Sequence, residues 1–436
     1  MNTCNALSLP AYTCFPGEQT IDASTSKSFL ETREQLKAQT QLFDYKTPES
    51  FMALAFDEKR IQSIKDMVEK LNALQPTDVI VCGIGGSSTG AQAIFNALAC
   101  GEAIQKPRMY FAEAIDPLSI GSLLNELKHY LDSEKTFSPI LLIISKSGTT
   151  QETLVNASCF IDFLSEHVPS YQKRVVCISE QNSPLAQVAQ KESFGFLDIP
   201  AAVSGRFSTF SAVGLLPLAL GGANINLLCL GAQNAIKRFI DEPFEANPVM
   251  QHAAFLNQHA QTHPISPIFC ALPSLAGIGG MYKQLFAESL GKQKKNGTRV
   301  GIHPTVSIMT QDLHSIIQLY LDGPQNHMTT FIKGVSTTSC IHSQPLKAFF
   351  AEQIFRDISS IDAHMRFVDA VLETYTEEQI PHTVIALGAI TGRILGALIS
   401  EAMITTVLLG NLWQINSFDQ PAISRYKKRL EPEQPK

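Results

Sequence analysis

Residues 78–90 read DVIVCGIGGSSTG, which predicts a buried strand, a glycine-rich turn and the start of a helix. Residues 140–150 read ILLIISKSGTT and repeat the same order, with helical sequence after them. Glycines let the backbone approach a ligand closely, while hydroxyl groups and the free amides of a helix N-terminus donate hydrogen bonds to an anion. Because the two turns contain a single lysine, Lys146, they suit a phosphate monoester better than a triphosphate.

Nucleotide-binding explanations of the first turn are weaker. The dinucleotide fingerprint requires glycine at its sixth position, where this chain has Ser88, and the Walker loop requires lysine where it has Ala91. A single turn of this kind would be a purely structural βα turn about half of the time. Two turns, both rich in hydroxyl groups, favour phosphate binding.

Strand-like apolar runs alternate with helical patterns from residue 78 onward, which is typical of a parallel sheet covered by helices on both faces. Helices are expected at 91–99 and 151–164, and the expected strands are 78–82, 108–113, 140–144, 174–179 and 195–199. In an open doubly wound sheet, ligands bind at the carboxyl ends of the strands where the strand order reverses. If the first and third strands flank that point, both turns open into one crevice.

A second, less regular α/β unit is expected after helical sequence at 211–220 and 232–240. Its candidate strands are 265–271, 305–309, 330–335 and 382–387. A length of 436 residues favours two domains of ordinary size. The segment before residue 78 is expected to be mostly helical.

Composition excludes several classes of protein. The net charge is −6 and basic residues form no long block, which argues against a nucleic-acid partner. No uninterrupted apolar span of about 18 residues is present, which argues against a membrane protein. Nine cysteines without paired spacing are typical of a reducing compartment, and the N-terminus lacks the pattern of a secretory signal. We therefore expect a soluble, cytoplasmic protein.

Three further segments carry recognisable motifs: residues 204–217 read SGRFSTFSAVGLLP, residues 284–292 read QLFAESLGK and residues 418–427 read FDQPAISRYK. Together with the two turns, and in this order along the chain, they resemble the glucose-6-phosphate isomerase family. Any one segment is modest support, whereas five in order are highly specific. The resemblance covers most of the chain, from about residue 83 to residue 427.

The resemblance implies an α/β fold of two flavodoxin-like sugar-isomerase domains, with parallel sheets in three-layer αβα sandwiches, and a C-terminal helical arm. The corresponding division is a mostly helical N-terminal segment, a first domain with the phosphate-binding loops, a second domain with the catalytic base, and the arm with its tail: residues 1–50, 51–225, 226–415 and 416–436. The implied reaction interconverts glucose 6-phosphate and fructose 6-phosphate in glycolysis and gluconeogenesis, with no metal or organic cofactor.

The resemblance also assigns site residues, motif by motif. The substrate-binding positions are the phosphate cradle and two glutamines: Gly86, Ser87, Ser145, Lys146, Ser147, Thr150, Gln284 and Gln420. The catalytic positions are Glu288, Arg206, His314 and Lys427. In the family the histidine comes from the neighbouring subunit, so a homodimer with shared active sites is implied.

Few groups are needed for the chemistry of an aldose–ketose isomerase. One carboxylate can move the proton between C2 and C1 through an enediol(ate), and Glu288 is assigned to this step. A fixed positive group stabilises the enediolate, which suits Arg206. Ring opening needs proton transfer at the ring oxygen and at O1, for which His314 and Lys427 are suited.

From the residues alone, each of these side chains also fits a structural role. Glu288 lies four residues before Lys292, the spacing of an ion pair on a helix surface. Arg206 fits a fork onto a carboxylate, His314 a helix cap or surface position, and Lys427 a solvated charge at a helix end. The matching motifs favour the catalytic roles.

Two other functions stay open at this point: an isomerase of a related sugar phosphate, and a non-catalytic regulator that binds sugar phosphates on the same domains. A metal site is not expected. His252, His259 and His263 lie close in sequence, but no acidic residue completes a metal-binding signature with them.

Overall fold

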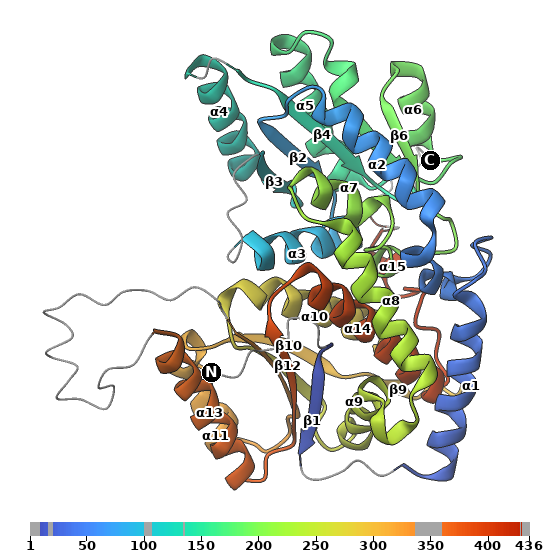
Figure 1. Cartoon of the computed structure of the whole chain (residues 1–436), viewed down its shortest axis with the longest axis vertical. Coiled ribbons are helices and arrows are strands. Elements are labelled where there is room, and N and C mark those ends of the chain that lie inside the picture. Colours follow the sequence, from blue (N-terminus) through green and yellow to red (C-terminus); the bar gives the residue numbers. More distant parts are fainter. Residues whose placement is uncertain are drawn as a thin grey trace, which may run out of the picture.

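The computed structural model describes residues 9–15, 21–99, 107–133, 136–335, 360–427 and 429. The start of the expected N-terminal segment and the end of the expected C-terminal arm, residues 1–8 and 430–436, lie outside them. The chain forms two sheets, one above the other in Figure 1, with helices α3 (Thr89–Ala99) and α10 (Ala276–Leu290) between them.

The first sheet is entirely parallel, with the order β3-β2-β4-β5-β6. Its strands are β2 (Asp78–Cys82), β3 (Arg108–Ala112), β4 (Pro139–Ile144), β5 (Val175–Ser179) and β6 (Gly195–Asp198). In chain order this is the flavodoxin-like pattern 2-1-3-4-5, and its switch point lies between β2 and β4. The expectation that the first and third strands flank the switch point is confirmed.

Helices cover both faces of this sheet. Alternate residues of one strand point to opposite faces, so Val79 and Val81 join one core and Ile80 and Cys82 the other. The first face is covered by α2 (Glu58–Asn72), α3 and α7 (Ala212–Leu220). The second is covered by α4 (Pro117–Ser133), α5 (Gln151–His167) and α6 (Pro184–Glu192). Because β2 is buried on both sides, its sequence is a continuous apolar run after Asp78.

The second sheet has the order β1-β12-β11-β7-β10. Its parallel strands are β7 (Ile265–Cys270), β10 (His303–Ile308), β11 (Thr329–Val335) and β12 (His382–Ala389). The fifth strand, β1 (Ala11–Phe15), pairs antiparallel with β12. The sequence did not predict β1, because a five-residue edge strand derives its conformation from a partner far along the chain. The helical part of this N-terminal region is α1 (Ala23–Gln39) and η1 (Pro48–Phe56).

Helices α8 (Ile225–Asp241), α9 (Pro248–His259) and α14 (Gly392–Leu412) complete the second unit, with α11 (Ile317–Asp322) and α13 (Ser360–Glu377) on its far side. Helix α8 begins earlier than the predicted residue 232, because the Asn224 side chain caps it by accepting from the amides of Asn226 and Leu227. The predicted strands agree with the observed ones to within two residues at each end.

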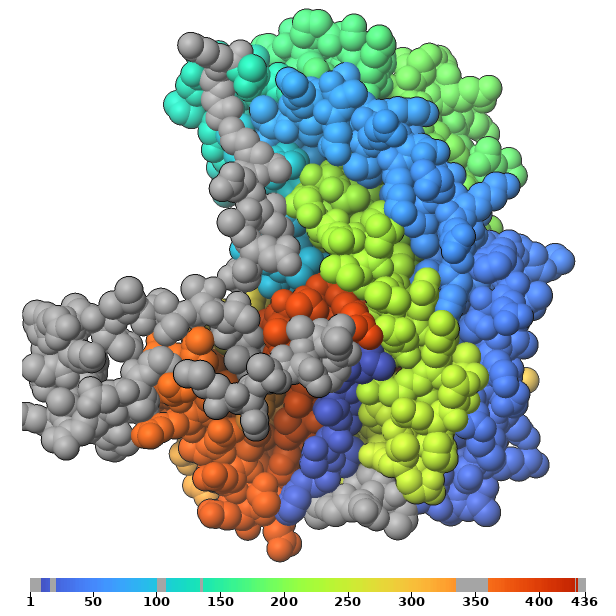
Figure 2. Space-filling view, in the orientation of Figure 1, coloured from blue at the N-terminus to red at the C-terminus, as the bar shows by residue number. Residues whose placement is uncertain are grey.

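Helix α14 is the central helix of the second unit. By length and composition it could cross a membrane, but 94% of its most apolar 18-residue window is buried inside the protein. It crosses α8 at very short range: a Cβ on Gly231 would lie 1.9 Å from the Arg393 carbonyl oxygen, and a Cβ on Gly396 would lie 2.0 Å from that of Leu228. α14 is therefore a core helix of the described protein. In Figure 2, α2 and α8 form adjoining surfaces that run from the first unit to the second.

Candidate active site

A pocket of about 1680 Å³ lies where the two units meet. The first unit contributes η2 (Gly85–Ser87), the turn between β4 and α5, and the nearby η4 (Gly205–Phe207). The second unit contributes α10 and the strand β10, and the C-terminal segment contributes α15 (Ile423–Lys427). All the residues predicted for the site line this pocket except Ser145 and His314.

The two glycine- and hydroxyl-rich turns form one wall of the pocket. They lie side by side because β2 and β4 are parallel neighbours, which brings their carboxyl ends to the same edge of the sheet. Gly86, Ser87, Lys146, Ser147 and Thr150 face the pocket. Ser145 lies buried beneath this surface, where its hydroxyl donates to Thr150 Oγ1 at 2.9 Å.

Gly86 allows the first turn to touch η4. A Cβ at this position would lie 2.3 Å from the carbonyl carbon of Gly205 and 2.5 Å from the amide nitrogen of Arg206. No side chain fits into that space, so the close approach of the two backbones requires glycine. Gly86 thereby fixes the first glycine-rich turn directly against the turn that carries Arg206.

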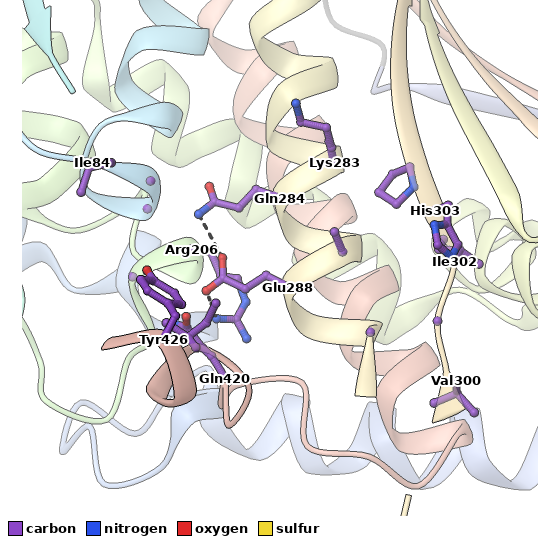
Figure 3. A pocket seen from close by; sticks show the side chains of 18 of the residues that line it. Ile84, Arg206, Lys283, Gln284, Glu288, Val300, Ile302, His303, Gln420 and Tyr426 are labelled. Carbon is purple, nitrogen blue, oxygen red and sulfur yellow. Dashed lines mark hydrogen bonds and ion pairs between the residues drawn. The ribbon is translucent and has the colours of Figure 1, made fainter. Parts of the chain in front are cut away.

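Glu288 lies in the last turn of α10 and is 23% exposed. Its Oε1 accepts from Arg206 Nη1 at 3.0 Å, and its Oε2 accepts from Gln284 Nε2 at 3.1 Å. Figure 3 shows both contacts, with Lys283 further along the same helix. The alternative of a surface ion pair with Lys292 is not formed, because the Lys292 ammonium donates to the Glu288 main-chain oxygen at 2.8 Å instead.

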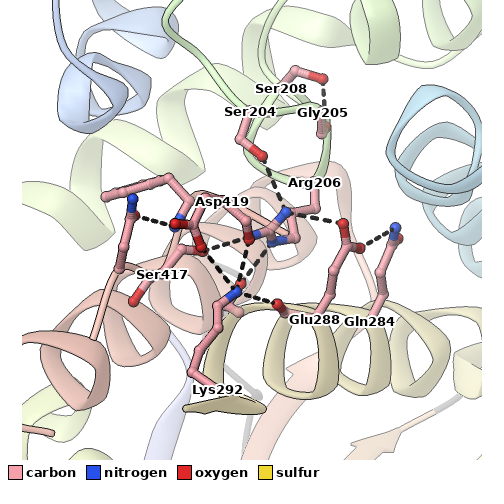
Figure 4. A network of polar contacts seen from close by, with 12 residues as sticks. Ser204, Gly205, Arg206, Ser208, Gln284, Glu288, Lys292, Ser417 and Asp419 are labelled. Carbon is pink, nitrogen blue, oxygen red and sulfur yellow. Dashed lines mark hydrogen bonds and ion pairs between the residues drawn. The ribbon is translucent and has the colours of Figure 1, made fainter. Parts of the chain in front are cut away.

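Arg206 is almost completely buried, with 1% of its side chain exposed. All five of its N–H groups donate to protein oxygens (Figure 4), and these belong to Ser204 Oγ, Ser289 Oγ, Glu288 Oε1 and the carbonyl groups of Ser417 and Asp419. Burial lowers the pKa of Arg206, while the Glu288 and Asp419 carboxylates oppose that shift. A guanidinium stays protonated at any physiological pH, so the pocket wall contains a fixed positive charge.

His314 is placed differently from the other predicted catalytic residues. It is exposed at the end of η7 (Gln311–His314), before α11, and does not line the pocket of its own chain. Gln420 and Lys427, from the C-terminal segment, do line it. One chain thus brings three of the four predicted catalytic side chains together.

Sequence reasoning missed several residues of the pocket wall. Glu180 lies 3.6 Å from the Lys146 ammonium, and Glu152 lies at the start of α5. Beyond Glu288 the pocket extends along α10 to Lys283 and across to His303 at the start of β10. Glu152 lies two residues after the quoted stretch 140–150, but no signal identified the others because they are ordinary surface residues in the sequence.

The histidines considered as a possible metal site are mainly part of the core. Burial lowers the pKa of His252 to about 3 and that of His259 to about 4. His252 Nε2 lies 3.4 Å from Thr330 Oγ1, and its Nδ1 has no hydrogen-bond partner in the described part of the chain. Among the described residues, no group of three or more histidine, cysteine, aspartate or glutamate side chains is arranged to hold a metal ion.

Comparison with known proteins gives consistent matches. The sequence model of the family "Phosphoglucose isomerase" matches residues 59–430. A glucose-6-phosphate isomerase of Methanocaldococcus jannaschii is 32% identical over 372 residues, which cover 83% of this chain and 85% of that protein. A glucose-6-phosphate isomerase of Rubrobacter xylanophilus is 27% identical and covers 87% of this chain and 88% of its own length.

Solved structures share the fold. The crystal structure of a hypothetical protein from Thermus thermophilus superimposes with a TM-score of 0.80 at 26% identity, covering 92% of this chain and 94% of that one. That of a glucose-6-phosphate isomerase from Chlamydia trachomatis gives a TM-score of 0.77 at 18% identity, covering 96% of this chain and 87% of that one. Both matches cover more than nine-tenths of this chain.

Proposed function

The chain belongs to the phosphoglucose isomerase family, and we propose that the pocket described above is where it interconverts glucose 6-phosphate and fructose 6-phosphate. The enzyme is an aldose–ketose isomerase, and its reaction is a step of both glycolysis and gluconeogenesis. The observation that carries the assignment of the site is the position of Glu288. Its carboxylate contacts Arg206 in the same pocket as two hydroxyl-rich turns, so a base and an anion cradle face one substrate-sized space.

The phosphate group is proposed to bind at the first unit. Ser87, Ser147 and Thr150 offer hydroxyl groups there, and Lys146 offers a positive charge. Thr150 is the N-cap of α5 but its side chain makes no capping hydrogen bond. The amides at the start of this 17-residue helix are therefore not satisfied by their own cap, and they favour an anion.

The proton transfer is proposed to take place at Glu288, which removes the proton from C2 and returns it to C1. Arg206 contributes through its charge, because its five N–H groups are already engaged by the protein. When Glu288 takes up the proton it loses its negative charge, and the buried guanidinium then faces the enediolate as the remaining anion. Such a preorganised charge stabilises the transition state without any rearrangement.

Ring opening is proposed to use Lys427 and the histidine of a second subunit. His314 is exposed and outside its own pocket, so a neighbouring copy would have to supply it. We therefore propose a homodimer with shared active sites. The proposal also places the enzyme in the cytoplasm, and the six cysteines described as free thiols are consistent with a reducing compartment.

The shared site has a direct test. Glu288→Gln and His314→Asn variants, each inactive alone, are mixed, unfolded and refolded together. Random pairing makes half of the dimers mixed, and one of the two sites in each mixed dimer has both native residues. Activity should return to roughly a quarter of the wild-type value. Absence of recovery, with mixed dimers verified by mass, contradicts a shared site.

The isomerase activity itself is tested with purified protein, fructose 6-phosphate and coupled glucose-6-phosphate dehydrogenase, with EDTA present. Turnover is expected without added metal, and its absence would refute the proposed function. Mannose 6-phosphate and glucosamine 6-phosphate assayed in parallel address the related sugar phosphates. The regulator alternative is not favoured, because a binding module needs no carboxylate at the position of Glu288.

A further inference from the structure

The C-terminal segment is held at the pocket by two cations. The carbonyl groups of Ser417 and Asp419 both accept from Arg206 Nη2. The Lys292 ammonium donates to the Asp419 carbonyl at 2.7 Å and lies 3.4 Å from Asp419 Oδ1. Figure 4 shows Lys292, which lies just after the end of α10, pointing at both the helix and this segment.

Lys292 joins two parts of the site that are far apart in sequence. Its ammonium also donates to the main-chain oxygen of Glu288 at 2.8 Å. One side chain therefore connects the backbone of the proposed base to Asp419, which is followed at once by the pocket residue Gln420. Through the same segment it connects the base to Lys427.

The three hydrogen-bond donors of an ammonium group match the three acceptors around it. These acceptors are the carbonyl oxygens of Glu288 and Asp419 and the carboxylate of Asp419. The Lys292 side chain is 7% exposed. Burial and the neighbouring Arg206 lower the pKa of Lys292, and Asp419 opposes the shift. Because two hydrogen bonds and one ion pair already tie this buried ammonium to protein oxygens, its geometry suits holding protein groups in place.

The C-terminal segment has few other attachments near the pocket. Helix α15 has only five residues and none of them is buried. The preceding Phe418 is held by ring contacts with Phe51 and Phe207, at centroid distances of 6.3 and 5.0 Å. The polar contacts of Lys292 and Arg206 therefore fix the position of the chain immediately before Gln420.

We propose that Lys292 is a positioning residue that fixes Gln420 and Lys427 relative to Glu288. This inference rests on the proposed function for its kinetic consequence, but the structural consequence is independent of it. We call the contacts of the Lys292 ammonium with Glu288 and Asp419 the clamp. Loss of the clamp moves Gln420 and Lys427 away from Glu288. It leaves the phosphate-binding turns untouched, because these belong to the first unit.

The kinetic test compares Lys292→Met with Lys292→Arg, and uses Lys295→Met as the matched control. Lys295 is exposed three residues away and does not line the pocket. We expect kcat to fall about 10- to 100-fold in Lys292→Met, since a displacement of about 1 Å has effects of this size. KM should change less than about threefold, Lys292→Arg should recover part of kcat, and Lys295→Met should match the wild type. A Lys292→Met enzyme that keeps more than half of the wild-type kcat overturns the proposal.

A second readout uses the single tryptophan of the chain. Trp413 is 8% exposed and lies four residues before Ser417. Acrylamide quenching of Trp413 fluorescence should rise in Lys292→Met and stay at the wild-type level in Lys295→Met, with both proteins folded by circular dichroism. Unchanged quenching in Lys292→Met refutes the clamp. A wild-type protein without turnover refutes the isomerase assignment instead, so the two failures are distinguishable.

Discussion

The first sheet is built from one continuous stretch of chain, from β2 to β6, whereas the second takes its edge strand β1 from the N-terminal region. The four parallel strands of the second sheet, β7, β10, β11 and β12, repeat the 2-1-3-4 order of the first. The fifth position is filled by β6 in one sheet and by the antiparallel β1 in the other. One architecture is thus completed in two different ways.

The two units also differ in which ends of their strands and helices face the pocket. The first unit uses the turns after β2 and β4, at its switch point, and presents backbone amides and hydroxyl groups. The second presents Glu288 from the last turn of α10, the helix that follows β7. The rule that ligands bind at the carboxyl ends of the strands therefore locates the proposed phosphate-binding wall but not the proposed base. We expect substitutions in the two hydroxyl-rich turns of the first unit to affect binding, and those in α10 of the second unit to affect catalysis.

The largest effect is expected from Glu288→Gln in the second unit. The amide keeps the size of the carboxylate and can accept from Arg206, but it cannot take up the proton. Steady-state kinetics should show kcat reduced about 10³-fold with little change in KM, as for the loss of a general base. A variant that retains more than a tenth of the wild-type kcat would remove Glu288 as the base.

The next largest effect is expected from Gly86→Ala, where the two turns touch. A methyl group there would overlap Gly205 and Arg206, and overpacking of this kind destabilises a protein by about 1–3 kcal/mol. Denaturant unfolding should give a loss of that size, together with reduced kcat/KM. Gly121→Ala is the matched control, since nothing lies within 4 Å of its Cβ position in α4. It should be neutral or stabilising by up to about 1 kcal/mol. Equal effects of the two substitutions would contradict the close contact.

A smaller effect is expected from Thr150→Ala in the first unit. The substitution removes one protein hydroxyl group that is proposed to donate a hydrogen bond to the charged phosphate. Loss of such a bond weakens binding by about 1.5 kcal/mol, which corresponds to a KM about tenfold higher. Because the base is untouched, kcat should stay within about twofold of the wild type. A fall in kcat at constant KM would contradict the assignment of substrate binding to this turn and of catalysis to α10.

The smallest effect is expected in the pH dependence of the free energy of unfolding, and it comes from a histidine in the core of the second unit. His252 belongs to the second unit, and burial lowers its pKa to about 3 from an ordinary value of 6.5. Below pH 6.5 the unfolded chain binds a proton that the folded chain does not, so this histidine makes stability fall as the pH falls. The loss between pH 6.5 and 5.5 should be about 1 kcal/mol greater in the wild type than in His252→Gln. Urea unfolding at the two pH values measures this difference, and equal losses would contradict the assignment.

The sequence predicted the first unit closely, because its central strands β2, β4 and β5 are apolar runs that a glycine or a cluster of polar residues ends. The position of the pocket wall after β2 and β4 could be predicted from the expected strand order alone. The roles of Glu288 and Arg206 depended on the family resemblance, since their spacing also fits ordinary ion pairs. Their hydrogen-bond partners come from three separate segments, residues 204–206, 284–292 and 417–419, and no local pattern could reveal that arrangement.

The strand β1 has a consequence for how the chain is made. The ribosome releases β1 long before its partner β12, because Ala11 pairs with Ala386. The first sheet can form as soon as β6 has emerged, whereas the second has to wait until β12 has been made. During that interval β1 has no partner, and an unpaired strand edge is the kind of surface on which nascent chains associate wrongly. Its brevity, five residues with none fully buried, limits that risk.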